Sequence, residues 1–186
     1  MNKELEHKGV WTGEYKGIKF EIVNWKLGDF LCWNYYLCLP IEQIPIEYHK
    51  YFILPGKYRK LCPDGQAHLM YNYNGAAYIS DLDWHGDITF YEKQRDSEGK
   101  IIGVKLGCDY AHHFDKQVNY SYNIDYVLME TKQTINKLHV LIPNLKVRCQ
   151  WNGNYYNQNE CEDLPQGGFL ARENKGKWFT PLGIEQ

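Results

Sequence analysis

Two short segments of the sequence gather the residue types that do acid–base and metal chemistry. Residues 84–87 read WHGD, and residues 107–115 read GCDYAHHFD. If these segments end two paired strands of a hairpin, His85 lies near Asp109, and the loop through Asp115 folds over the same sheet edge. We therefore expect one polar site there. Its predicted ligand-binding residues are Trp84, His85, Gly86, Asp109, Tyr110, His112 and Asp115, with Asp87 and His113 as neighbours.

The spacing within the second segment predicts its local structure. Asp109, His112 and Asp115 are three residues apart. On an α-helix the third side chain would rotate away from the first, whereas on a 3-10 turn, with three residues per turn, all three line one edge. The spacing therefore predicts a tight turn over the end of the sheet.

Such a cluster allows three kinds of chemistry. Imidazoles and carboxylates can hold a divalent metal ion that keeps open positions. A His–Asp pair can act as a general base with its orienting partner. Neutral His and Asp side chains can also hydrogen-bond a ribose or a base edge in a concave site. A metal ion would take its ligands from His85, Asp109, His112 and Asp115.

Purely structural roles compete with these chemical ones. Asp109 can cap a turn with its carboxylate, which is a common use of Asp at strand ends. His112 can donate to a backbone carbonyl. Gly86 and Gly107 can serve turn geometry alone. The convergence of several ionisable residues where loops leave a sheet favours a functional site over these roles.

Alternating and apolar runs indicate the strands that must position the site. Residues 13–25 alternate with a period near two, which predicts a strand pair or one long strand. Residues 31–39 are almost wholly apolar or aromatic, which is typical of a central strand. The polar turn at residues 96–100 should join strands 86–93 and 101–108 as antiparallel neighbours. Further short strands are expected at residues 75–80, 168–171 and 177–180, and one helical turn near residues 42–51.

One long helix is expected after the second segment. Apolar or small residues recur at the helical spacing of a buried stripe, namely Ile124, Leu128, Thr131, Ile135 and Leu138. Asn123 or Asp125 can cap its start. These elements predict an α+β fold, a mainly antiparallel β-sheet with the helix packed on one face, in a single domain spanning residues 1–186.

Net charge and apolar content limit the classes of partner that the protein is expected to bind. The chain of 186 residues has a formal net charge of −2, so duplex nucleic acid, which needs many phosphate contacts, is not expected. No apolar run approaches the ~20 residues that span a bilayer, and the charged N-terminus lacks a signal core. We expect a cytosolic protein that does not bind membranes. Its six cysteines lack Cys-x-x-Cys spacing and are expected to be small buried thiols.

Aromatic side chains are unusually frequent, at 16% of residues with 16 Tyr and 6 Trp. Aromatic residues suit half-buried strand surfaces, which accounts for much of this excess. The remainder can line a ligand pocket, because Tyr and Trp offer flat apolar faces with a polar group at one end.

The two segments resemble motifs of uncharacterised phage and prophage proteins. That family has His-Gly-Gly-Leu/Ile-Thr-Phe/Tyr, then Gly-Phe-Asp-Cys-Ala-His-x-Gly-Asp, then a Tyr-Val-x-x-Glu helix. Here residues 85–90 read HGDITF, residues 107–115 read GCDYAHHFD and residues 126–130 read YVLME. The family's second Gly is Asp87 here, and the Gly before its last Asp is Phe114. The resemblance implies a phage protein acting in the host cytosol, and carries over His85, Asp109, His112 and Asp115.

Three functions fit these features. The first is capture of a small nucleotide-derived ligand without a cofactor, which could silence a host immune signal. The second is a metal-dependent hydrolase, such as a phosphodiesterase, that uses the four-residue cluster. The third is an inhibitor that binds a host enzyme. A homo-oligomer is also compatible with the sequence, because small ligand-capturing proteins often place sites between subunits.

Overall fold

An antiparallel sheet of five strands forms the centre of the computed structural model. The structure describes residues 6–27, 30–53, 79, 82–112, 115, 122–149, 152–157, 160–163 and 169–171. The strand order of the sheet is β1-β2-β3-β5-β4, and all neighbours are antiparallel. The strands are β1 Glu6–Tyr15, β2 Ile18–Leu27, β3 Phe30–Pro40, β4 Phe90–Arg95 and β5 Ile101–Asp109. The predicted α+β class with an antiparallel sheet is therefore confirmed.

The first hairpin confirms that residues 13–25 contain a strand pair. β1 and β2 meet at Lys16 and Gly17, whose φ angles of 46° and 73° are both positive, as a two-residue type I′ turn requires. Ile18 and Ile22 are buried on the core face of β2. β3 follows and pairs with both β2 and β5, which confirms it as a central strand.

The second hairpin carries the candidate site at its open end. The turn predicted at residues 96–100 is present: the N–H of Asp96 donates to the carbonyl of Lys100 (3.0 Å), and the Asp96 carboxylate accepts from the N–H of Lys100 (2.9 Å). β4 begins at Phe90, however, so the prediction of a strand from residue 86 was wrong at its start. The reason is a turn, in which the N–H of Asp87 donates to the carbonyl of His85 (2.8 Å).

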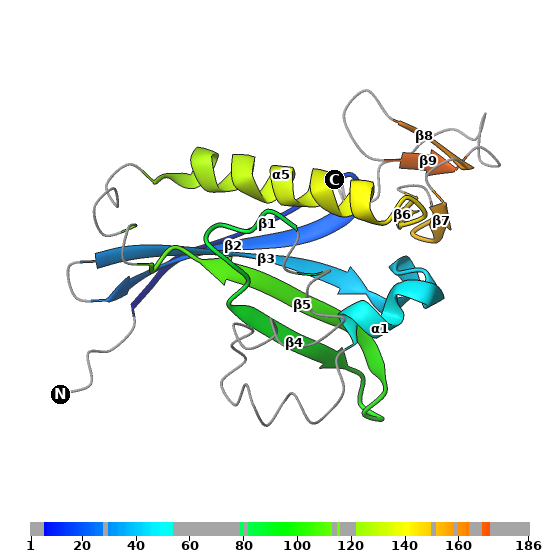
Figure 1. Cartoon of the computed structure of the whole chain (residues 1–186), viewed down its shortest axis with the longest axis horizontal. Helices are drawn as coiled ribbons and strands as arrows, with labels where there is room; N and C mark the ends of the chain where they lie inside the picture. Colours follow the sequence, from blue (N-terminus) through cyan, green and yellow to red (C-terminus); the bar gives the residue numbers. More distant parts are fainter. Residues whose placement is uncertain are drawn as a thin grey trace, which may run out of the picture.

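The long helix α5, Ile124–Leu141, lies across one face of the sheet (Figure 1). Of the two caps that the sequence allowed, Asn123 is the one present, and its side chain accepts from the N–H of Tyr126. The buried stripe is shifted from the predicted one, because Ile124 and Leu128 are only partly buried. Its buried residues are Val127, Thr131, Thr134, Ile135 and Leu138.

Smaller elements complete the described chain. The helical turn predicted near residues 42–51 appears as η1 Ile41–Gln43, η2 Ile46–Tyr48 and a short second helix, α1 His49–Phe52. Two small hairpins follow α5: β6 Lys146–Arg148 with β7 Tyr155–Asn157, and β8 Cys161–Asp163 with β9 Phe169–Ala171. β9 matches the expected strand at residues 168–171. Of the strand expected at residues 75–80 only Ile79 is described, and it is helical, so the prediction is wrong there. The strand expected at 177–180 lies outside the described residues.

Two composition-based expectations bear on this fold. Four of the described cysteines, Cys32, Cys108, Cys149 and Cys161, are buried, as expected of small thiol side chains; Cys62 lies outside the described residues. Among the described helices, none combines the length and apolar character needed to cross a membrane.

The packing of α5 on the sheet yields a stability prediction. Leu138 is fully buried, whereas Val140 on the same helix is 71% exposed. We expect Leu138→Ala to lower the free energy of unfolding by about 2–5 kcal/mol, because it leaves a cavity. Val140→Ala should change it by less than about 0.5 kcal/mol. Urea unfolding measures both, and similar losses from the two variants would contradict this packing.

Candidate functional site

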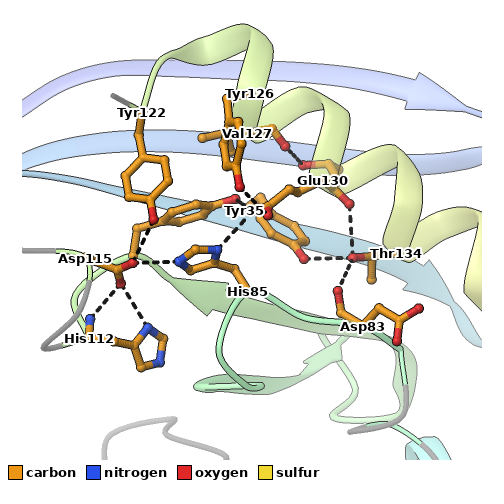
Figure 2. A network of polar contacts seen from close by, with 12 residues as sticks. Tyr35, Asp83, His85, His112, Asp115, Tyr122, Tyr126, Val127, Glu130 and Thr134 are labelled. Atoms are coloured by element: carbon orange, nitrogen blue, oxygen red, sulfur yellow. Dashed lines mark hydrogen bonds and ion pairs between the residues drawn. The ribbon is translucent and has the colours of Figure 1, made fainter. Parts of the chain in front are cut away.

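The imidazole ring of His85 lies between two carboxylates from distant parts of the chain (Figure 2). Its Nε2 is 2.8 Å from Asp115 Oδ1, and its Nδ1 is 3.0 Å from Glu130 Oε2. The His85 side chain is 8% exposed and that of Asp115 is 0% exposed. Because both ring nitrogens face an acceptor, a ring that donates to both carboxylates carries two protons and a positive charge.

Asp115 is the most connected group of the site. Its Oδ1 accepts from His85 and from the hydroxyl of Tyr122 (3.0 Å). Its Oδ2 lies 2.8 Å from the backbone N–H of His112 and 3.0 Å from His112 Nδ1. A carboxylate offers about four acceptor positions, so these contacts use its capacity and fix its orientation.

Sequence reasoning missed Glu130 as a site residue, as it did Tyr122 and Tyr126. Glu130 projects from α5, and its carboxylate accepts from the hydroxyls of Tyr110 and Tyr126 as well as facing His85. Tyr126 and Glu130 are one helical turn apart, a spacing that places two side chains on the same face. The Tyr-Val-x-x-Glu motif at residues 126–130 contained the signal, since a helix packed over the hairpin would bring this face to His85.

Tyrosine rings surround the charged groups. The His85 ring stacks on the ring of Tyr110, with centroids 3.8 Å apart and an interplanar angle of 14°. Tyr122 presents its edge to His85, at 5.5 Å, and packs against Tyr126 at 5.2 Å. Tyr110, a predicted site residue, is buried, so its ring is the interior surface on which the His85 ring stacks.

The environment shifts the pKa values of the three central groups toward their charged forms. Burial would lower the pKa of His85, but the hydrogen bonds to Glu130 and Asp115 outweigh burial and raise it. Burial would raise the pKa of both carboxyls, yet hydrogen bonds with His85 and other donors lower the pKa of Asp115 and of Glu130. The arrangement therefore favours an imidazolium between two carboxylates.

His112 forms the more exposed edge of the site, with a side chain that is 25% exposed. The N–H of Asp115 donates to the carbonyl of His112 (3.1 Å), which is the i to i+3 bond of the predicted tight turn. Gly86 lies against this ring with a φ of +70°, and a Cβ there would lie 2.4 Å from His112 Cε1. Gly86 is thus required both by its backbone conformation and by the neighbouring imidazole.

The prediction that Asp109 joins this cluster was wrong. Asp109 is the last residue of β5, between Cys108 and Tyr110, whose side chains belong to the core under α5. Because side chains alternate along a strand, Asp109 points to the opposite face of the sheet. Its carboxylate accepts from the N–H of Ala111 (3.0 Å), which is the turn-capping role described above.

Other predicted residues take structural positions. Trp84 is buried, its indole N–H donates to the carbonyl of Ile79 (2.7 Å), and its ring stacks on Tyr35. The Asp87 carboxylate accepts from the N–H of Ile88. His113 and Phe114 lie outside the described residues. The structure therefore brings together His85, His112 and Asp115, supported by Gly86 and Tyr110.

No family model, curated protein or solved structure matches this chain. What the site can do chemically is therefore inferred from its geometry. The cluster can donate and accept hydrogen bonds at the His112 edge, and it offers a His112–Asp115 pair of the general-base type. His85, His112 and Asp115 also offer ligand atoms within 4.8 Å of one another, and imidazole and carboxylate groups are ligands that transition-metal ions use.

The saturated Asp115 carboxylate predicts a large effect of Asp115→Asn. The amide nitrogen would face N–H or O–H donors, and His85 would lose one charged partner, so we expect a loss of about 3–5 kcal/mol in the free energy of unfolding. Asp109→Asn is the matched control, because an amide oxygen can still accept from Ala111. Urea unfolding of both variants tests this contrast, and equal losses would contradict it.

The pKa shifts of His85, Asp115 and Glu130 also predict how the free energy of unfolding depends on pH. The measurement uses protein treated with a chelator, so that no metal ion competes with protons for these groups. The raised pKa of His85 adds stability that is lost as pH rises through that pKa, and the lowered pKa values of Asp115 and Glu130 add stability that is lost as pH falls through them. We expect maximal stability between about pH 4.5 and 6.5. Glu130→Gln should reduce the loss on the alkaline side. A wild-type free energy of unfolding that rises steadily from pH 6 to 9 would contradict the charged His85.

Proposed function

We propose that this protein captures a small nucleotide-derived ligand at the His112 edge of the site. The observation that carries the proposal is the combination of fixed hydrogen-bonding groups with an aromatic surface beside them. His112 is partly exposed there and contacts Asp115, which also accepts from the Tyr122 hydroxyl, while Tyr126 donates to Glu130 at the other ring nitrogen of His85. Ligand sites of this kind place a few polar groups among apolar or aromatic side chains.

Charge indicates which part of a nucleotide the site would contact. Two carboxylates, Asp115 and Glu130, face one imidazolium at His85, which leaves an excess negative charge. This charge favours hydrogen-bond donors such as ribose hydroxyls or base amino groups, and disfavours phosphate oxygens. We therefore place the nucleoside part of the ligand at the His112 edge and its phosphates farther away.

Tyr126 in the first turn of α5, with Tyr122 just before the helix, supplies the stacking surface. Tyr126 is 36% exposed, and its hydroxyl is held by Glu130 at 2.9 Å. Its ring packs against Tyr122, so the Tyr126 side chain loses little conformational freedom when a ligand binds. Stacking of a base on such a ring contributes about 1–3 kcal/mol in nucleic-acid complexes.

The biological setting of this proposal rests on the motif resemblance. Of the four residues that the resemblance carries over, His85, His112 and Asp115 belong to the network, and Asp109 does not. Tyr126 and Glu130 of the matching helix motif also join it. A phage protein that sequesters a nucleotide signal in the host cytosol would act against host immunity by lowering the concentration of that signal. Such a role needs tight binding and no turnover.

A thermal-melting assay with a panel of nucleosides, nucleotides and cyclic dinucleotides tests the proposal. A ligand at 100 times its Kd stabilises by about 2.7 kcal/mol, so we expect at least one to raise the melting temperature by about 5–10 °C. Tyr126→Ala should reduce this shift, whereas Val140→Ala near the far end of α5 should keep it.

The fate of the ligand separates capture from the hydrolase alternative. Chromatography of the bound ligand after denaturation should return it unchanged. Cleaved ligand would favour hydrolysis instead. If no member of the panel raises the melting temperature at saturating concentration, nucleotide capture is rejected.

A further inference from the structure

We infer that His85, His112 and Asp115 form a binding site for one divalent first-row transition-metal ion of the zinc class. The candidate ligand atoms are one ring nitrogen of each histidine and one carboxylate oxygen of Asp115, and all lie within 4.8 Å of one another. This inference does not depend on the proposed nucleotide ligand. Two imidazoles and one carboxylate suit zinc, cobalt or iron better than magnesium or calcium, which prefer oxygen ligands.

The candidate ligand atoms already lie close together, with Asp115 at hydrogen-bond distances from the imidazoles that are shorter than those around a bound ion. Asp115 stands between the two imidazoles, 2.8 Å from His85 Nε2 and 3.0 Å from His112 Nδ1. Ligand atoms at ~2.0–2.1 Å from one zinc ion are about 3.3–4.2 Å apart. Side-chain shifts of about 1 Å, with release to solvent of the protons on the ligating ring nitrogens, would therefore convert the hydrogen-bonded cluster into a set of ligands around one ion.

Glu130 prepares His85 for this role. Its carboxylate lies 3.0 Å from His85 Nδ1, so that nitrogen donates to Glu130 while Nε2 faces Asp115. Histidine ligands of metal ions generally donate their other ring N–H to a carboxylate or carbonyl, which fixes the ring and strengthens the ligand. Glu130 is thus a positioning residue that would not itself bind the ion.

The burial of the three ligands indicates the route by which an ion would enter the site, and their number indicates whether the ion would keep a bound water. Asp115 and His85 are almost wholly enclosed, whereas the His112 side chain is 25% exposed. An ion would therefore enter past His112. Three protein ligands leave at least one coordination position for water, as in zinc enzymes and unlike closed structural sites. A metal-bound water is the group that the hydrolase alternative requires.

Isothermal titration of the chelator-treated full chain with ZnCl₂ tests this inference. We expect one zinc ion per chain in the wild type. His112→Ala should abolish this binding event, and Glu130→Gln should weaken it about 10–100-fold. Asp109→Asn is the control and should bind as the wild type does, because Asp109 points to the other face of the sheet. MgCl₂ should give no binding at the same concentrations.

Cysteine thiolates also bind zinc, so the comparison of variants decides the outcome. Zinc binding that survives in His112→Ala, or its absence from the wild type, would overturn the site. Circular dichroism and thermal melting establish that each variant is folded, and His112→Gln replaces His112→Ala if the latter is not. The nucleotide panel run once with chelator and once with zinc keeps the two proposals apart, because a melting shift with chelator supports capture even if zinc does not bind.

Discussion

The contact of one imidazole with two carboxylates is the interaction on which the site depends. His85 joins Asp115, 30 residues away, and Glu130, 45 residues away, so three chain segments meet at one ring. Without His85, two largely enclosed carboxylates would face each other with no opposing charge, which is strongly unfavourable in a protein interior. This requirement fixes how the loop before β4, the turn after β5 and helix α5 lie relative to one another.

The sequence predicted the parts of the fold that repeat regularly. Alternation along β2 and the apolar run of β3 follow from burial of one or both sheet faces, and the polar turn after β4 is a local signal. The start of β4 was mispredicted, because the turn at Gly86 and Asp87 has strand-like neighbours. The buried stripe of α5 was shifted by Val127 and Thr134, since contact with this particular sheet decides which side of the helix is covered.

The sequence anticipated that His85, His112 and Asp115 would converge, but not that Glu130 would join them. His112 and Asp115 belong to one tight turn, and the hairpin brings His85 beside Tyr110. Spacing by three included Asp109 wrongly, because the strand extends to that residue and its alternation sends the side chain to the other face. Glu130 was missed because sequence spacing alone does not show where a helix packs.

In the metal-free protein, a charged His85 shared by Asp115 and Glu130 holds the site together. Long-range ¹H–¹⁵N NMR of the imidazole rings, recorded on metal-free protein at neutral pH, observes this state directly. We predict that both His85 nitrogens are protonated and that their protons exchange slowly with water. A neutral His85 ring with one nitrogen lacking a proton would contradict the account.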